Sequence, residues 1–144
     1  MLIGEYVHSI DAKKRLSIPA KFRKEIGKRA VLTRGLDRSL FLYSLEEWKV
    51  IAEKLNTLPA GQANTRGFVR LMLAGALDVE VDSLGRILVP EYLKEYAGLG
   101  QTVVVTGVYN RLEIWDERIW GEYKARIEKE VTDIAEKLGK VGAF

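Results

Sequence analysis

The sequence contains no cysteine and only one histidine. The lack of cysteine excludes a disulfide framework and thiolate metal sites, and it fits a reducing compartment. The chain also lacks a phosphate-binding loop of the Gly-x-x-x-x-Gly-Lys type and a Gly-x-Gly-x-x-Gly dinucleotide fingerprint. Its carboxylates are plentiful, but none forms an obvious acid–base pair in the sequence. We therefore expect a protein that is not an enzyme and that uses no cofactor, no metal ion and no small-molecule substrate.

Long apolar runs are missing as well. No stretch approaches the roughly 18 to 20 residues that span a bilayer, and the first residues lack the basic start and apolar run of a signal peptide. At 144 residues, 47% hydrophobic and 30% charged, the composition is that of a folded globular chain. We expect a cytoplasmic protein without membrane contact, built as one ordinary domain or two small intertwined ones.

The net charge of +3 is small, but the charges are unevenly distributed. Residues 1–39 hold ten Lys and Arg against four Asp and Glu, whereas residues 40–144 hold thirteen against sixteen. A basic first third on a slightly acidic body favours a patch that binds a polyanion. A solvated basic surface explains the same distribution equally well.

One motif occurs twice in the chain. Residues 11–19 read Asp-Ala-Lys-Lys-Arg-Leu-Ser-Ile-Pro, and residues 82–90, seventy-one positions later, read Asp-Ser-Leu-Gly-Arg-Ile-Leu-Val-Pro. The correspondence continues beyond the motif, where Trp48 of the first copy matches Trp120 of the second if the second copy has one extra residue. We infer two copies of a unit of about seventy residues.

Each copy predicts strand, turn, strand, short helix, two more strands and a final helix. In the first copy, residues 3–10 and 16–18 predict a hairpin whose turn, at 11–14, is basic. The alternation buries Leu16 and Ile18 and exposes Arg15. Ser44-Leu-Glu-Glu is a capping box that opens a helix, and the last helix is predicted over 116–138. We divide the chain into a first repeat at 1–58, an inter-repeat helix within 59–78, and a second repeat at 79–144 with a long C-terminal helix.

These elements predict the α+β class. A lone hairpin pair is marginally stable in water, so each repeat needs a partner to cover its apolar face. We expect the two repeats to pack on each other about a pseudo-two-fold axis. That arrangement would place the turns at 11–15 and 82–86 in related positions.

The same residues resemble a known family. The segment Gly4-Glu-Tyr-Val-His8, the paired Asp-x-x-x-Arg motifs and Pro19-Ala-Lys-Phe-Arg23 are similar to the MraZ proteins, and the resemblance covers essentially the whole chain. It implies two tandem swapped-hairpin, β-barrel-like repeats of the AbrB/SpoVT type with flanking helices. It also implies a bacterial, nucleoid-associated transcriptional regulator that forms ring-like homo-oligomers. Such a regulator binds short DNA repeats upstream of the division and cell-wall gene cluster, which includes its own gene.

The chain departs from the family pattern at one position. The family has glycine directly before the first motif arginine, as Gly85 stands before Arg86, but here that position is Lys14. We therefore expect a non-glycine residue at positive φ in the first turn.

The candidate DNA-binding residues are Lys13, Lys14, Arg15 and Arg86. A guanidinium on the exposed side of the strand suits a phosphate or the edge of a guanine, and the two lysines suit phosphates. Alternatively, Asp11 and Asp82 pair with the motif arginines and hold the turns shut, and both roles are compatible if each Asp orients its Arg. Residues 79–100 carry two bases against four acids, so we expect the first repeat to make most phosphate contacts and Arg86 to contribute less.

Two classes of function fit these observations. The first is a sequence-specific regulator that binds double-stranded promoter DNA and assembles with itself. The second is a protein-interaction module of the same fold, either antitoxin-like or a ring scaffold. An antitoxin usually needs an extra segment that wraps its toxin, whereas the second half of this chain is another folded repeat. The basic residues of 1–39 speak against a pure scaffold, so the regulator is favoured.

Overall fold

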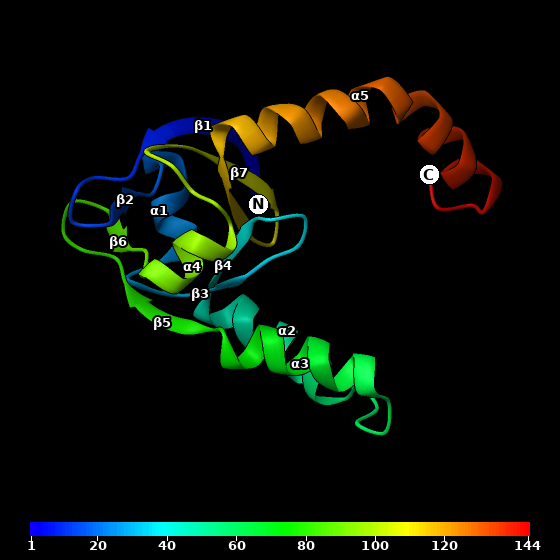
Figure 1. Ribbon diagram of the computed structural model, residues 1–144, viewed down its shortest axis with the longest axis horizontal. Helices are drawn as coiled ribbons and strands as arrows, with labels where there is room; N and C mark the ends of the chain where they lie inside the picture. The colour runs from blue at the N-terminus through cyan, green and yellow to red at the C-terminus, as the bar shows by residue number, and fades with distance from the viewer.

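The computed structural model describes all 144 residues (Figure 1). The strands are β1 (Leu2–Ser9), β2 (Arg15–Ser17), β3 (Arg29–Arg34), β4 (Leu40–Ser44), β5 (Leu77–Glu80), β6 (Arg86–Leu88), β7 (Thr102–Tyr109) and β8 (Leu112–Asp116). The helices are α1 (Ala20–Ile26), α2 (Leu45–Asn56), α3 (Ala63–Ala74), α4 (Glu91–Tyr96) and α5 (Glu117–Lys140). The predicted α+β class is confirmed.

The strands of the two repeats exchange partners. The main sheet has six antiparallel strands in the order β1-β7-β8-β4-β3-β5. Strand β1 of the first repeat therefore pairs with β7 of the second, and β5 of the second repeat pairs with β3 of the first. At the centre, β4 and β8 pair with each other, with Phe41 opposite Glu113. Strands β1, β7 and β8 correspond to β5, β3 and β4 of the other repeat. The sheet is therefore symmetric, because its two halves have corresponding strands in the same order from each edge to the centre.

A second, two-stranded sheet joins the repeated motifs. Strand β2 pairs with β6 through Arg15–Leu88, Leu16–Ile87 and Ser17–Arg86. The predicted hairpin ladder between the strands on either side of the first turn is wrong, because those strands share only one bridge, between Ile10 and Leu16. The pairing of β2 with β6 brings Leu16 and Ile87 together beneath the ribbon, where their exposed fractions are 0% and 1%.

One core serves both repeats. It contains twenty buried residues, among them Ile18, Phe22 and Ile26 from the first repeat and Val89 and Leu93 from the second. Burying a side chain of this size contributes about 1.5–3 kcal/mol each, so neither repeat is expected to be stable after losing the other. A smaller cluster of four residues joins the sheet to α2 and α3 (Phe41, Tyr43, Leu55 and Met72).

The last helix, α5, packs on the sheet only near its start. Asp116 caps it by accepting hydrogen bonds from the backbone N–H groups of Arg118 and Ile119, and Trp120 packs on Trp115 with ring centroids 5.1 Å apart. Beyond these turns the helix extends away from the body (Figure 1), and none of its residues is fully buried. The predicted capping box of α2 is also present, with Ser44 Oγ accepting from Glu47 N at 3.2 Å. No helix is both long enough and apolar enough to cross a membrane.

Candidate nucleic-acid interface

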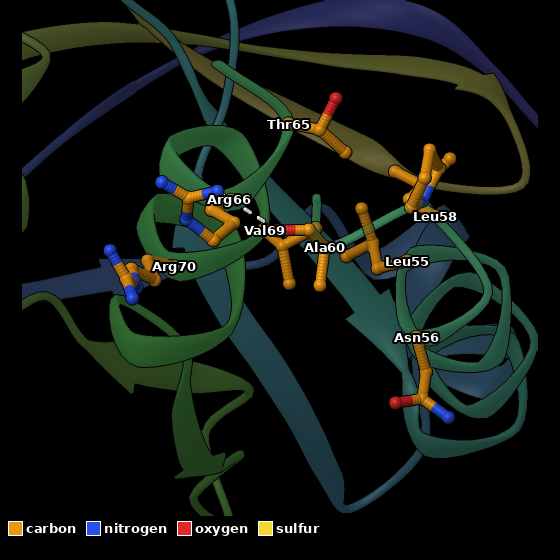
Figure 2. A pocket seen from close by; sticks show the side chains of 9 residues that line it. Leu55, Asn56, Leu58, Ala60, Thr65, Arg66, Val69 and Arg70 are labelled. Atoms are coloured by element: carbon orange, nitrogen blue, oxygen red, sulfur yellow. Dashed lines mark hydrogen bonds between the residues drawn. The ribbon is translucent and has the colours of Figure 1, made fainter. Parts of the chain in front are cut away.

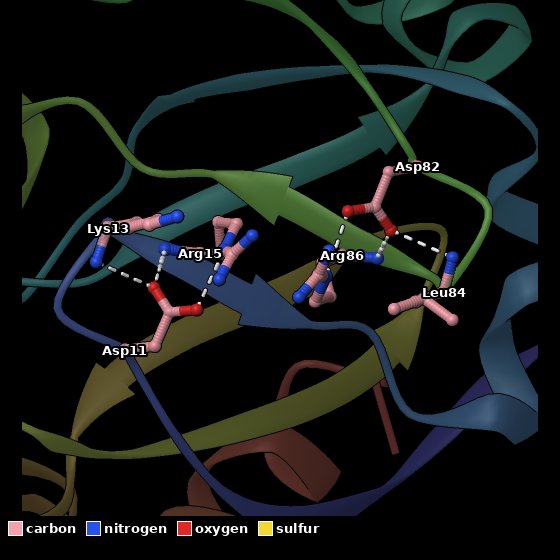
Figure 3. A network of polar contacts seen from close by, with 6 residues as sticks. All are labelled: Asp11, Lys13, Arg15, Asp82, Leu84 and Arg86. Carbon is pink, nitrogen blue, oxygen red and sulfur yellow. Dashed lines mark hydrogen bonds and ion pairs between the residues drawn. The ribbon is translucent and has the colours of Figure 1, made fainter.

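The two motif turns are closed by the same pattern of hydrogen bonds (Figure 3). In the first turn, Asp11 Oδ1 accepts from the backbone N–H groups of Lys13 and Arg15, both at 2.9 Å. In the second, Asp82 Oδ1 accepts from Leu84 at 3.0 Å and from Arg86 at 2.8 Å. A short polar side chain that bonds backbone amides two and four residues later closes a tight turn, which explains why both motifs begin with Asp.

Each Asp also holds the arginine that ends its turn. The Nε atoms of Arg15 and Arg86 donate to Oδ2 of Asp11 and Asp82 respectively, at 2.8 Å in both cases. The Nη groups of both arginines have no hydrogen-bond partner within the chain, and the two side chains are 31% and 26% exposed. The turn-closing pair and an outward-facing guanidinium therefore coexist. The carboxylate fixes the plane of the guanidinium, while the two Nη groups stay available to a ligand.

Both motif carboxylates are held in the charged form. The backbone N–H of Arg15 lowers the pKa of Asp11, with smaller contributions in the same direction from the Arg15 side chain and the Lys13 N–H, against a rise from desolvation. The pKa of Asp82 is lowered in the same way, first by the backbone N–H of Arg86. At neutral pH each carboxylate therefore keeps its arginine in place.

Lys14 adopts the backbone conformation that was predicted for it. Its φ is 62°, against 78° for Gly85 at the same place in the second turn. The turn keeps its shape, because Lys14 N donates to Asp11 O at 3.0 Å as Gly85 N donates to Asp82 O at 2.9 Å. The Lys14 ammonium lies 2.9 Å from Glu91 at the start of α4, and this contact lowers the pKa of Glu91. One of the two candidate phosphate-binding lysines is thus paired inside the chain.

Strands β2 and β6 present four side chains on their outer surface. Because Leu16 and Ile87 point into the core, the alternation turns their neighbours outward. We call this surface the ribbon face, and it consists of Arg15, Ser17, Arg86 and Leu88. Figure 3 shows the two arginines projecting from adjacent strands of this ribbon. The pairing thus brings the two motif arginines, seventy-one residues apart in the sequence, onto one exposed surface.

The surroundings of the second turn come from the first repeat. A cleft beside this turn is lined by Arg23, Lys24 and Lys28 of the α1 region together with Ser83 and Gly85. Arg23 Nε donates to Ile18 O at 2.8 Å, and its side chain lies so close to Gly85 that a Cβ at this glycine would overlap it. Sequence reasoning missed this contact, since it depends on the exchange of strands between the repeats.

Two carboxylates flank the other side of the second motif. Asp78 and Glu80 of β5 line a groove that also contains both motif arginines, Arg15 and Arg86, and Leu88. The first repeat has the neutral residues Val7 and Ser9 at the corresponding positions. Asp78 is partly neutralised by Arg29, whose Nη2 lies 2.7 Å from it. Negative charge therefore lies closer to the ribbon face on the side of the second repeat.

A separate hollow of about 270 Å³ lies between α2 and α3 (Figure 2). Leu55 of α2 and Val69 of α3 are among its apolar lining residues, and Arg66 and Arg70 of α3 line it as well. Arg66 Nη1 donates to Ala60 O at 3.0 Å, which ties the α2–α3 loop to α3. Figure 1 shows this helix pair well away from the ribbon, so the hollow is not part of the motif surface. The chain contains no group of three or more side chains placed to hold a metal ion.

Comparisons with known proteins agree with the repeated architecture. The sequence model described as "MraZ protein, putative antitoxin-like" matches twice, at residues 1–71 and 72–141. The chain is 51% identical over 138 residues to the "Transcriptional regulator MraZ" of Caldanaerobacter subterraneus subsp. tengcongensis, which covers 96% of each chain. It is 49% identical over 142 residues to the protein of the same name from Acetivibrio thermocellus, covering 99% of each chain.

Proposed function

This chain belongs to the MraZ family, and we propose that it is a sequence-specific, DNA-binding transcriptional regulator that reads DNA with its ribbon face. The observation that carries the proposal is the pair of Asp-held arginines on one exposed two-stranded ribbon. Each guanidinium is fixed through Nε and keeps both Nη groups without a partner in the chain. The names of the relatives support the role in transcription.

The geometry suits the major groove of double-stranded DNA. That groove is about 12 Å wide and admits a two-stranded β-ribbon. The paired Nη groups of an arginine match the O6 and N7 acceptors of guanine, and each such contact discriminates against other bases by about 1–3 kcal/mol. Because Asp11 and Asp82 already hold the guanidiniums, little side-chain freedom is lost when DNA binds.

Phosphate contacts come mainly from the first repeat in this proposal. Lys13 lies in the first turn, and its side chain has no ion-pair partner in the chain. Lys14 contributes less, because Glu91 competes for its charge. Arg23, Lys24 and Lys28 extend the basic surface beside the second turn. These residues position the ribbon on the duplex, while Arg15 and Arg86 read the bases.

The family resemblance suggests the targets and the location. We propose that the protein binds short repeated elements upstream of the division and cell-wall gene cluster, including its own gene. It would then act in the bacterial cytoplasm in association with the nucleoid. The exchange of β1 and β5 between the repeats supports a swapped-hairpin fold of the AbrB/SpoVT type. We propose 1–58 and 79–144 as the two repeats and 59–78 as the segment between them, with β5 of the second repeat beginning two residues before that boundary, at Leu77.

We also propose that the protein acts as a ring-like homo-oligomer. Helix α5 leaves the body with an apolar stripe that nothing in the chain covers, and Val131 and Leu138 on it are 53% and 42% exposed. Several ribbons in one assembly would bind repeated DNA elements together, so that individually weak contacts give tight binding. Replacing Val131 and Leu138 with Glu should yield smaller particles in light scattering that bind repeated DNA poorly. Unchanged particle size would contradict this role of α5.

The second candidate function is a protein-interaction module of the same fold. It is favoured by the exposed apolar stripe of α5, which a partner protein could cover as well as another copy could. In that case the motif arginines serve only to close their turns, and their removal should leave the main activity of the protein intact.

Fluorescence anisotropy with duplex DNA separates these candidates. The probe is the region upstream of the gene itself, compared with a scrambled duplex across a salt series. We expect preference for the upstream duplex, a steep loss of affinity with salt, and collapse of binding in Arg15→Ala. Arg70→Ala removes an exposed arginine on α3 away from the ribbon and serves as the matched control. No preference, or full binding by Arg15→Ala, would favour the interaction module.

A further inference from the structure

The ribbon face carries one exposed apolar side chain, Leu88. It is 56% exposed, and it lies opposite Arg15 in the register and two residues after Arg86 on the same strand. Its counterpart in the first repeat is Ser17, seventy-one residues earlier. The two motifs share their Asp, their Arg and their buried apolar positions, so within the ribbon face this is the position at which they differ in chemistry.

The register places Leu88 directly beside Arg15. Val89 N donates to Lys14 O and Ile18 N donates to Gly85 O, both at 2.8 Å. Hydrogen-bonded and non-bonded pairs alternate in an antiparallel ladder, so Arg15–Leu88 and Ser17–Arg86 are both non-bonded pairs. In such pairs the Cα atoms are only about 4.5 Å apart and the side chains are closest. The ribbon face therefore contains an Arg–Leu pair at one end and an Arg–Ser pair at the other.

A single exposed leucine is common on protein surfaces and needs no explanation by itself. This one belongs to the surface that the proposed function buries in the major groove. The only apolar group that a standard base pair presents there is the C5-methyl of thymine. Since the Arg15–Leu88 spacing of about 4.5 Å is close to the rise of about 3.4 Å per base pair, the two side chains would meet neighbouring base pairs.

We propose that Leu88 is a specificity-determining residue that contacts the C5-methyl group of a thymine in the base pair next to the guanine read by Arg15. This inference rests on the proposed function. At the other end of the ribbon, Ser17 has only a hydroxyl, which accepts and donates hydrogen bonds and tolerates several bases. One end of the ribbon thus reads two neighbouring base pairs, a guanine through Arg15 and a thymine through Leu88. The other end reads DNA mainly through Arg86.

Replacement of thymine by deoxyuridine tests this contact, because it removes only the methyl group. The probe is the tightest-binding duplex that the full-length protein selects from a randomised pool, with each thymine replaced singly. For the wild-type protein, one replacement should weaken binding about two- to fivefold, as expected for one buried methyl group. Leu88→Ala should weaken binding to the unmodified duplex by a similar or larger factor and abolish the effect of that replacement.

Two further variants make the result specific. Leu88→Met keeps an apolar side chain and should keep the sensitivity to deoxyuridine, whereas Ser17→Ala should leave it unchanged. Circular dichroism and light scattering of Leu88→Ala should match the wild type, since Leu88 is mostly exposed. A smaller particle would place Leu88 between copies and overturn the inference.

The failure of the inference differs from the failure of the proposed function. If the wild type selects no sequence from the pool, the proposed function is wrong, and the proposed role of Leu88 is wrong as well. If the wild type selects a duplex but no thymine replacement weakens binding, Leu88 reads no methyl group. The same conclusion follows if Leu88→Ala keeps the full deoxyuridine effect, and in both cases the regulator itself stands.

Discussion

The two turns of this protein have the same backbone and different surroundings. In each, an Asp bonds two backbone amides and the Nε of the arginine that follows, at nearly equal distances. The first turn lies against the second repeat, where Glu91 of α4 pairs with Lys14. The second lies against the first repeat, where Arg23 of α1 packs over Gly85. Each turn therefore takes part of its electrostatic environment from the other repeat.

Because of this exchange, the net charge of the sequence around a motif differs from the net charge that surrounds it in the folded protein. Counted by repeat, the second motif lies in an acidic segment, but in three dimensions the bases of α1 lie beside it. Asp78 and Glu80, which have no acidic counterparts in the first repeat, line a groove that contains both motif arginines. Because residues 79–100 still carry four acids against two bases, we expect the two arginines to contribute unequally to DNA binding, although both should contribute.

The largest expected effect is that of Arg15→Ala. Loss of a bidentate guanine contact costs about 1–3 kcal/mol, which is roughly a 5- to 150-fold loss of affinity for each ribbon. Arg86→Ala should cost less, because residues 79–100 around it carry four acids against two bases. Anisotropy titrations of both variants with the upstream duplex measure the difference. A greater loss for Arg86→Ala would reverse the comparison.

Placing lysine at position 85 should lower the stability of the fold more than placing glycine at position 14 changes it. Gly85→Lys forces a side chain into a left-handed conformation, which costs about 1–2 kcal/mol, and displaces Arg23 as well. Lys14→Gly removes the same strain from the first turn but loses the exposed pair with Glu91 and gives the unfolded chain more freedom, so we expect a change below about 1 kcal/mol. Urea denaturation of both variants measures these changes. Equal effects would show that the two turns tolerate side chains alike.

Removing the two carboxylates of β5 should increase the affinity for DNA, by less than the arginine variants decrease it. Asp78→Val with Glu80→Ser installs the residues of the first repeat. We expect a few-fold gain in affinity that shrinks at high salt, because exposed charges are screened beyond roughly 10 Å at 0.1 M salt. Glu46→Ser and Glu53→Val, two exposed positions on α2 away from the ribbon, form the control. An unchanged affinity would mean that these carboxylates do not influence the motif arginines.

The smallest effect near neutral pH is the titration of the two turn carboxylates. Their pKa values in the folded protein lie below the ordinary 3.8, so their contribution to stability is complete above that value. It is lost as the pH falls from about 3.8 through the folded pKa values. Thermal unfolding between pH 7 and pH 2.5 should show this loss, and the Asp11→Asn, Asp82→Asn double variant should show less of it. Identical pH profiles would assign the loss to other groups.

The sequence predicts the turns better than it predicts their neighbours. The alternation of Arg15, Leu16 and Ser17 predicts which side chains face outward, and the missing glycine predicts the positive φ of Lys14. These properties depend on a few adjacent residues. The same alternation applied to the second motif exposes Leu88, which is the signal that could have identified it.

Such local patterns do not predict which strands pair with each other. A strand edge with alternating residues can pair with any strand of matching pattern. The sequence predicts β2 beside β1, its neighbour in the chain, whereas in the structure β2 pairs with β6. The contacts of Lys14 with Glu91 and of Arg23 with the second turn follow from that pairing. Long-range pairing therefore determines the surroundings of the candidate site, while the local motif determines its shape.

In the proposed function Arg15 reads a base and does more than supply charge, and the Arg15→Lys variant separates these two roles. Lysine keeps the positive charge and can still pair with Asp11, but it lacks the planar fork that matches guanine. The measurement is the ratio of dissociation constants for the scrambled and upstream duplexes at one salt concentration. We predict that Arg15→Lys binds the scrambled duplex as the wild type does and loses most of the preference for the upstream one. Full preference in Arg15→Lys would contradict base reading by this arginine.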